Sequence, residues 1–173
     1  MDPYLYAHIS TFIPEHSSVL TNLAGGLLIK ETKDGNTYAN GVLHSFNDEP
    51  AMTLDDGSQF WYQQGKLHRA NDLPAGMWAD GDRCWYQNGK LHRENDLPAV
   101  IEEKNGIEEW YRYGMLHRDN DRPAVVYSNG NSEWYRNGVR HRDGKLPARI
   151  IMGGQKEYWR NGKKIRSNVL RRN

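Results

Sequence analysis

The chain has almost no cysteine and no long apolar run. Cys84 is the single cysteine among 173 residues, so an internal disulfide is excluded and a reducing compartment is favoured. The apolar stretch 20–29 is far too short to span a bilayer. Residues 1–3 lack the basic start of a signal peptide, and Glu15 interrupts the apolar residues that follow. We therefore expect a cytoplasmic protein that does not enter a membrane.

Charge of one sign is also missing. The sequence has 23 basic and 22 acidic residues, a formal net charge of +1. Non-specific binding to nucleic acid or to an anionic membrane usually needs a basic excess, so neither is expected, and no sequence-specific nucleic-acid partner is predicted. The exception is the end of the chain, where no acid follows Glu157. Residues 167–173 are expected to form a basic, solvated tail.

One motif is written four times: an aromatic pair, a glycine, a His-Arg pair and then Pro-Ala. The four copies run over 61–75, 85–99, 110–124 and 134–148. Weaker copies flank them, beginning at Tyr38 and at Tyr158. The aromatic starts recur about every 24 residues, which is the spacing of a repeat array built from one supersecondary unit. Such an array needs no central core, which explains the low apolar content.

Each repeat reads as a β-hairpin. In the unit that starts at Pro98, the extended run 98–103 is followed by Asn105-Gly106 and by a return strand over 107–112. Asn-Gly between two such runs is the strongest short-range hairpin signal. The predicted fold class is all-β: an elongated, antiparallel, single-sheet solenoid of stacked β-hairpins. We expect an N-terminal cap at 1–26, six repeats over 27–166, and the tail.

The two aromatic residues of each pair are adjacent, so their side chains should point to opposite faces of the sheet. The segment after the second glycine is expected to cover the tryptophan side with Leu67, Leu91 and Leu116, and the Asn-Asp pairs are expected to hold its turn through their own backbone. The tyrosines would then lie on an open face, where polar-tipped aromatics suit partner binding. Packing on the cap or on a second copy is an equally good interpretation. The residues concerned are Tyr62, Tyr86, Tyr111 and Tyr135.

The pattern Trp-Tyr-x-Asn-Gly-x-Leu-His resembles the MORN repeat, over roughly residues 38–166. It is most similar to variants with His-Arg in bacteriophage, giant-virus and bacterial antitoxin-like proteins. In the four full copies the histidine is followed by arginine, where MORN repeats proper have glycine. The resemblance implies a β-hairpin repeat fold and gives no catalytic residues to carry over.

The His-Arg pairs are the obvious chemical candidates. Equivalent histidines should recur about every 10 Å, too far apart to share a zinc ion whose ligand nitrogens lie about 2 Å away. The array also repeats identical groups where an active site needs differently tuned ones, so no enzyme, metal or cofactor is predicted. A structural role is favoured, with histidine donating to a neighbouring carbonyl and arginine stacking on an aromatic or pairing with Asp72, Asp96 or Asp121. The alternative is an anion-binding row made of Arg69, Arg93, Arg118 and Arg142.

These features predict a non-enzymatic repeat protein that works by binding. The leading hypothesis is an inhibitor of phage, viral or antitoxin type that masks a host or toxin protein. One alternative is sequestration of a small anionic, nucleotide-like ligand by the arginine row. Another is a structural or virion component, and homo-oligomerisation stays open.

Overall fold

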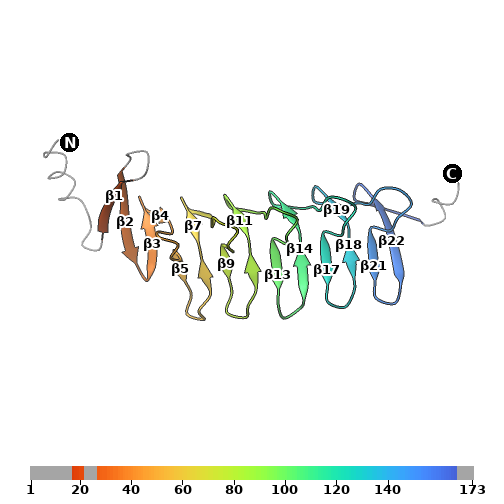
Figure 1. Ribbon diagram of the computed structural model, residues 1–173, viewed down its shortest axis with the longest axis horizontal. Coiled ribbons are helices and arrows are strands. Elements are labelled where there is room, and N and C mark those ends of the chain that lie inside the picture. The colour runs from red at the N-terminus through yellow and green to blue at the C-terminus, as the bar shows by residue number, and fades with distance from the viewer. Residues whose placement is uncertain (1–16, 22–26, 167–173) are drawn as a thin grey trace.

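The structure, a computed structural model, describes residues 17–21 and 27–166. In these residues it contains strands, turns and links but no helix. Figure 1 shows the strands standing side by side along one long axis in chain order. The expected all-β, antiparallel repeat fold is confirmed.

The main sheet has eleven strands, and every described pairing in it is antiparallel. Its strands are β5 (Met52–Thr53), β6 (Gln59–Phe60), β9 (Gly76–Met77), β10 (Arg83–Cys84), β13 (Val100–Glu102), β14 (Ile107–Glu109), β17 (Val125–Tyr127), β18 (Ser132–Glu133), β21 (Arg149–Ile151), β22 (Gln155–Arg160) and β23 (Lys163–Ile165). Neighbouring strands follow chain order, so each repeat contributes one hairpin and the next repeat pairs beside it.

Each central repeat also forms a second, smaller hairpin at the upper edge in Figure 1. These pairs are β7 (Tyr62–Gln63) with β8 (Lys66–Leu67), β11 (Tyr86–Gln87) with β12 (Lys90–Leu91), β15 (Tyr111–Arg112) with β16 (Met115–Leu116), and β19 (Tyr135–Arg136) with β20 (Val139–Arg140). A separate four-stranded sheet precedes the array. It contains β1 (Ser17–Thr21), β2 (Leu27–Lys33), β3 (Asn36–Ala39) and β4 (Val42–Leu43).

The return strand is interrupted at tryptophan, so the continuous strand expected over 107–112 is wrong. Strand β14 ends at Glu109 and β15 begins at Tyr111. The Trp110 N–H donates to Ala124 in the next hairpin of the main sheet, whereas its carbonyl accepts from the N–H of His117. Trp110 therefore belongs to both hairpins, and the chain changes direction there.

The upper turns use two successive residues with positive φ, which suits a type I′ turn between twisted strands. Asn88 and Gly89 have φ values of 52° and 78°, and Asn137 and Gly138 have 49° and 81°. Glycine accepts this conformation without a steric penalty, and asparagine tolerates it better than most residues. The Asn-Gly pairs of the repeat are explained by this geometry.

The core is a row rather than a centre. Tryptophan and alanine alternate along it, because the backbone N–H of each of these tryptophans donates to the carbonyl of the alanine that begins the next hairpin of the main sheet. The alanines are fully buried and the tryptophans are at most 8% exposed. The row consists of Ala51, Trp61, Ala75, Trp85, Ala99, Trp110, Ala124, Trp134 and Ala148.

The predicted ends of the chain lie largely outside the described residues. Of the expected cap at 1–26, only β1 is described, and it pairs with β2. The expected tail at 167–173 lies wholly outside them.

Candidate functional surfaces: the arginine row and the tyrosine face

Each arginine of the His-Arg pairs lies flat on the tryptophan of its own repeat. The Arg118 guanidinium carbon is 3.6 Å from the centre of the Trp110 ring, and Arg93 lies 3.8 Å from Trp85. Cation–π contact of this kind is strongest with tryptophan. The stacked side chains are only 13–15% exposed, so the guanidinium groups are part of the packed side of the sheet.

The same arginine is bound by the preceding repeat. Arg93 donates from Nε and Nη2 to both carboxylate oxygens of Asp72, each at 2.8 Å, and from Nη1 to the carbonyl of Pro98. The indole N–H of Trp85 donates to the backbone carbonyl of Asp72 at 2.9 Å. We call this set the Trp-Arg-Asp node. It recurs as Trp61-Arg69-Asp48, Trp85-Arg93-Asp72, Trp110-Arg118-Asp96 and Trp134-Arg142-Asp121.

The expected stacking and ion pairing of arginine are therefore confirmed. Three N–H groups and one face of each guanidinium are engaged within the array, which gives the anion-capture alternative no support at Arg69, Arg93, Arg118 or Arg142. The hydrogen bonds from arginine hold the pKa of Asp48, Asp72, Asp96 and Asp121 below the usual range. Both residues of each Asn-Asp pair have positive φ, and the aspartate side chain binds the arginine of the next repeat. The pairs therefore join their turn to the next repeat through these arginines.

Histidine plays a different role from the one expected. Its ring does not donate to a neighbouring carbonyl: Nδ1 accepts the backbone N–H at the upper turn of the next repeat. Asn137 donates to His117 at 3.1 Å, for example. The prediction failed because the ring nitrogen accepts a bond from the turn of the following repeat, a contact between repeats that the sequence of one repeat does not show. These bonds join His44 to Gln64, His68 to Asn88, His92 to Tyr113, His117 to Asn137 and His141 to Asn161.

Three of these histidines also contact a carboxylate two residues further on. His92 Nε2 lies 2.8 Å from Glu94, and His141 Nε2 lies 2.8 Å from Asp143. Because Nδ1 is the acceptor, the proton of the neutral ring sits on Nε2, which donates to the acid. Small polar hollows lie between adjacent links, one of about 160 Å³ lined by His92, Arg112 and Asp119.

The tyrosines lie on the side of the sheet opposite the nodes, as expected from their adjacency to tryptophan. The Tyr135 hydroxyl donates to Glu133, two residues earlier, whereas the Trp134 indole reaches the link at Asp121. The leucines share the tyrosine side: Tyr62 pairs directly across its hairpin with Leu67, and Tyr86 with Leu91. The expectation that Leu67, Leu91 and Leu116 cover the tryptophans is therefore wrong.

We call this side of the sheet the tyrosine face. Its tyrosines and leucines are half-buried. Toward the start of the array it is apolar, and burial raises the pKa of the Cys84 thiol to about 12. Its middle contains Glu109, whose pKa is raised by burial. Members of the face in the apolar half are Phe60, Tyr62, Leu67, Cys84, Tyr86, Leu91 and Val100.

The far end of the same face is ionic, a feature that the sequence reasoning missed. Glu133 is 4% exposed and is bound by Arg140, Arg149 and the Tyr135 hydroxyl. Arg140 stands where the earlier repeats have leucine, and its guanidinium also lies over the Tyr135 ring at 5.2 Å. The replacement of Leu116 by Arg140 at the same repeat position was the available signal. A buried acid and its cation replace an apolar pair here.

The described ranges contain no cluster of His, Cys, Asp and Glu that could hold a metal ion. Over the same ranges, no helix is long and apolar enough to cross a membrane.

The fold and the repeated nodes define a β-hairpin repeat protein. No family model, no curated protein and no solved structure matches the chain.

Proposed function

We propose that this chain is a non-enzymatic binding protein that masks another protein with its tyrosine face. The observation that carries the proposal is the row of half-buried tyrosines and leucines on one side of a long sheet. Aromatic residues with polar tips are enriched in protein interfaces, and apolar neighbours exclude water from them. The arginines of the Trp-Arg-Asp nodes are engaged in joining neighbouring repeats. The tyrosine face is therefore the better candidate of the two surfaces for binding a partner.

The tyrosine face changes from an apolar half to an ionic half along the array, so the proposed interface has a direction. Repetition alone would give the same face in every unit, yet Leu67 and Leu91 give way to Arg140. A partner would therefore bind in one direction, with its own apolar surface over Tyr62 and Tyr86 and polar groups near Glu133. The resemblance to phage, viral and antitoxin-like repeat proteins favours an inhibitor as the type of binder.

The test uses a photocrosslinking amino acid in place of Tyr86 on the tyrosine face, with the same residue in place of Lys104 as a matched control on the exposed lower turn. A single protein crosslinked in stoichiometric amount only from position 86 is the expected result. That protein, once purified, should bind the wild-type chain and lose binding to Tyr86→Asp. Crosslinking from position 104 alone, or none from 86, would contradict the proposal.

A further inference from the structure

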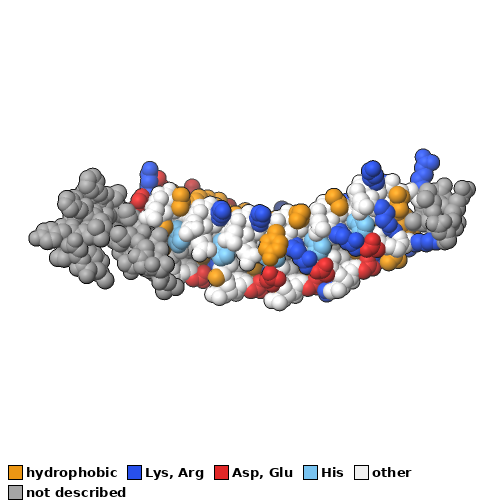
Figure 2. Space-filling view, turned by 90° about the horizontal axis from the view of Figure 1, so that it is seen from above, with side chains coloured by type: hydrophobic (Ala, Val, Ile, Leu, Met, Phe, Trp, Pro, Cys, Tyr) orange, Lys and Arg blue, Asp and Glu red, His pale blue; other side chains and the backbone are white. Residues whose placement is uncertain are grey.

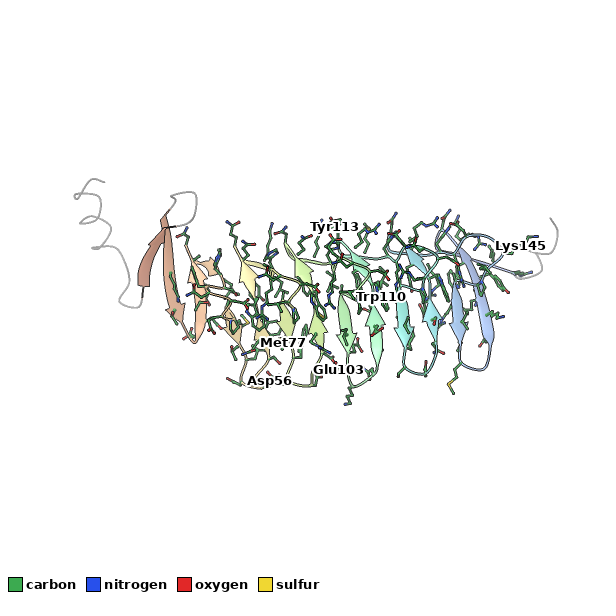
Figure 3. The ribbon with its side chains drawn as sticks, viewed as in Figure 1. Asp56, Met77, Glu103, Trp110, Tyr113 and Lys145 are labelled. Carbon is green, nitrogen blue, oxygen red and sulfur yellow. The ribbon has the colours of Figure 1, made fainter. Side chains whose placement is uncertain are left out.

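The upper edge of the array carries basic residues in every unit, although the net charge is only +1. The upper hairpins span 63–66, 87–90, 112–115, 136–139 and 160–163, and none of these segments contains an acid. The first three lower turns carry Asp55, Asp56, Asp80 and Glu103 beside Lys104, whereas the lower turns at 128–131 and 152–155 carry no charged residue. Figure 3 labels Tyr113 at the upper edge and Asp56 and Glu103 at the lower one. Net charge therefore conceals a basic edge.

We call the row of upper hairpins the tip ridge. Its basic residues are Lys66, Lys90, Arg112, Arg136, Arg160 and Lys163. Lys66, Lys90 and Lys163 form no ion pair with any residue in the described ranges. Arg112 and Arg136 contact Asp119 and Asp143, and Arg160 donates to the backbone carbonyls of Arg142 and Trp159. Figure 2 looks onto this edge and shows basic and hydrophobic side chains following one another along it.

The tips are packed directly on one another, so their cations are held at a fixed spacing. The Gly89 N–H donates to the carbonyl of Leu67 at 2.8 Å, and the Gly114 N–H donates to Leu91 at 2.8 Å. A Cβ on Gly89 would lie 3.5 Å from Cβ of Lys66. With two strands per repeat, equivalent side chains recur about every 10 Å. The ridge is a rigid row of positive charge.

Tyr113 breaks the rule of the tips. It has a φ of 49° at a turn position that asparagine occupies in three of the other tips, Asn88, Asn137 and Asn161. A bulky side chain in this region is a conformational outlier, and such outliers cluster at functional sites. The residue is 54% exposed, and its ring stacks on His92 with centroids 4.2 Å apart and planes 14° from parallel. His92 therefore holds one face of the Tyr113 ring at the solvent-exposed edge, in the row that contains the basic residues of the tips.

We propose that the tip ridge binds single-stranded nucleic acid without sequence preference. The unpaired lysines Lys66, Lys90 and Lys163 contact phosphates, and a base stacks on the Tyr113 ring, which His92 holds in position. A basic groove or row combined with an aromatic stacking surface is the usual design of such sites. An acidic protein would be attracted by the charge, but it offers no reason for a strained aromatic at the centre of the row. This site is separate from the tyrosine face and does not depend on the proposed function.

The electrostatic part is tested by fluorescence anisotropy with labelled oligodeoxyuridylate and oligouridylate of about 16 nucleotides, the upper end of common single-strand site sizes. The logarithm of the association constant should fall linearly with the logarithm of salt concentration. Each phosphate contact removed should reduce that slope by about 0.7. The double variant Lys66→Gln with Lys90→Gln should therefore lower it by about 1.4, two contacts at that value each. Lys104→Gln, on the lower edge, should leave it unchanged.

The stacking part is tested with Tyr113→Asn, which installs the residue of the other tips and so keeps the turn folded. Affinity should fall at least about fivefold, and Tyr113→Trp should retain it. If both oligonucleotides bind equally well, phosphate and base are sufficient for recognition. If one of them binds more tightly, its sugar is recognised as well. No binding at low salt overturns the proposal, as does full affinity in Tyr113→Asn. Equal binding to polyglutamate-coated beads or to phosphatidylserine vesicles also overturns it.

Discussion

At the scale of single residues, arginine is the side chain that most firmly joins one repeat to the next. Arg118 stacks on Trp110 of its own repeat and binds both oxygens of Asp96 in the preceding one. A planar guanidinium can do both at once, whereas an ammonium group cannot. The arginine that follows the histidine in each full copy of the motif is therefore explained by folding.

We predict that Arg118→Lys destabilises the protein by about 1–3 kcal/mol, because the charge remains but the bidentate pair and the stacking are lost. The measurement is the urea midpoint from circular dichroism. Lys104→Ala, at an exposed turn, is the control and should change stability by less than about 0.5 kcal/mol. A variant as stable as the wild type would show that the node is dispensable.

Stability should fall in acid. Arginine lowers the pKa of the node aspartates, and Arg136 and His141 lower that of Asp143 to about 2. The unfolded chain then binds protons first, so the contribution of these groups is present above about pH 4 and is lost as the pH falls toward their folded values. Thermal midpoints between pH 7 and pH 2 should show this decline. Asp96→Asn should shift less with pH than the wild type, and a flat profile would contradict the assignment.

Histidine adds a second acid-sensitive step at higher pH. Burial lowers the pKa of His44, and its Nδ1 accepts the Gln64 N–H, a bond that a proton on Nδ1 would abolish. A lowered folded pKa means that the unfolded chain takes up the proton first, so stability is lost as the pH falls through about 6.5. His44→Gln should remove part of the change in thermal midpoint between pH 7.5 and pH 5.5. If it does not, the bond carries no weight.

At the scale of the element, the alternating tryptophan and alanine row leaves no room for larger side chains. Ala99 is fully buried, and its carbonyl accepts from the Trp85 N–H. Ala99→Val should cost roughly 1–3 kcal/mol by overpacking, as measured by the urea midpoint. Leu97→Ala, at a residue 39% exposed, should cost much less. Equal effects would mean that the row can relax.

The element was predicted only in part, for reasons visible at particular residues. Asn105-Gly106 and the opposed Trp and Tyr faces follow from local backbone rules. The break at Trp110 does not, because the residues on both sides still look like one strand and the tertiary bond to Ala124 decides it. The leucines were assigned to the wrong face because their pairing register with tyrosine depends on a two-residue turn inside the link.

At the scale of the whole molecule, the hydrogen bonds and ion pairs of the described residues lie within a unit or between neighbouring units, so a unit should be removable. Deleting residues 110–133 joins Glu109 to Trp134 at equivalent repeat positions. We expect a folded protein shorter by about 10 Å in small-angle scattering. Its urea m-value should fall in proportion to the surface no longer buried. A deletion of residues 110–121, half a unit, is the mismatched control and should not fold. An unfolded 110–133 deletion would contradict a neighbour-only array.

Of the two candidate surfaces, the sequence predicted the tyrosine face, whereas the tip ridge was not predicted. Bases lie beside the upper glycine of each unit, as Lys66 and Lys90 do, and no acid lies in these turns, whereas acids such as Asp56 occur only at lower turns of the first units. This signal was present in the sequence. Counting charge over the entire chain averaged it away, and only the placement of the two turns at opposite edges gives it meaning.

The array, slightly bowed in Figure 2, can lengthen over evolutionary time by the addition of whole units. Duplicating one unit lengthens the arc without altering any existing contact, because the new unit meets its neighbours through the same Trp-Arg-Asp node. The length of the array can therefore increase in steps of one unit. Residues at the tips and on the tyrosine face remain free to diverge unit by unit, as Tyr113 and Arg140 have done, while the node stays constant.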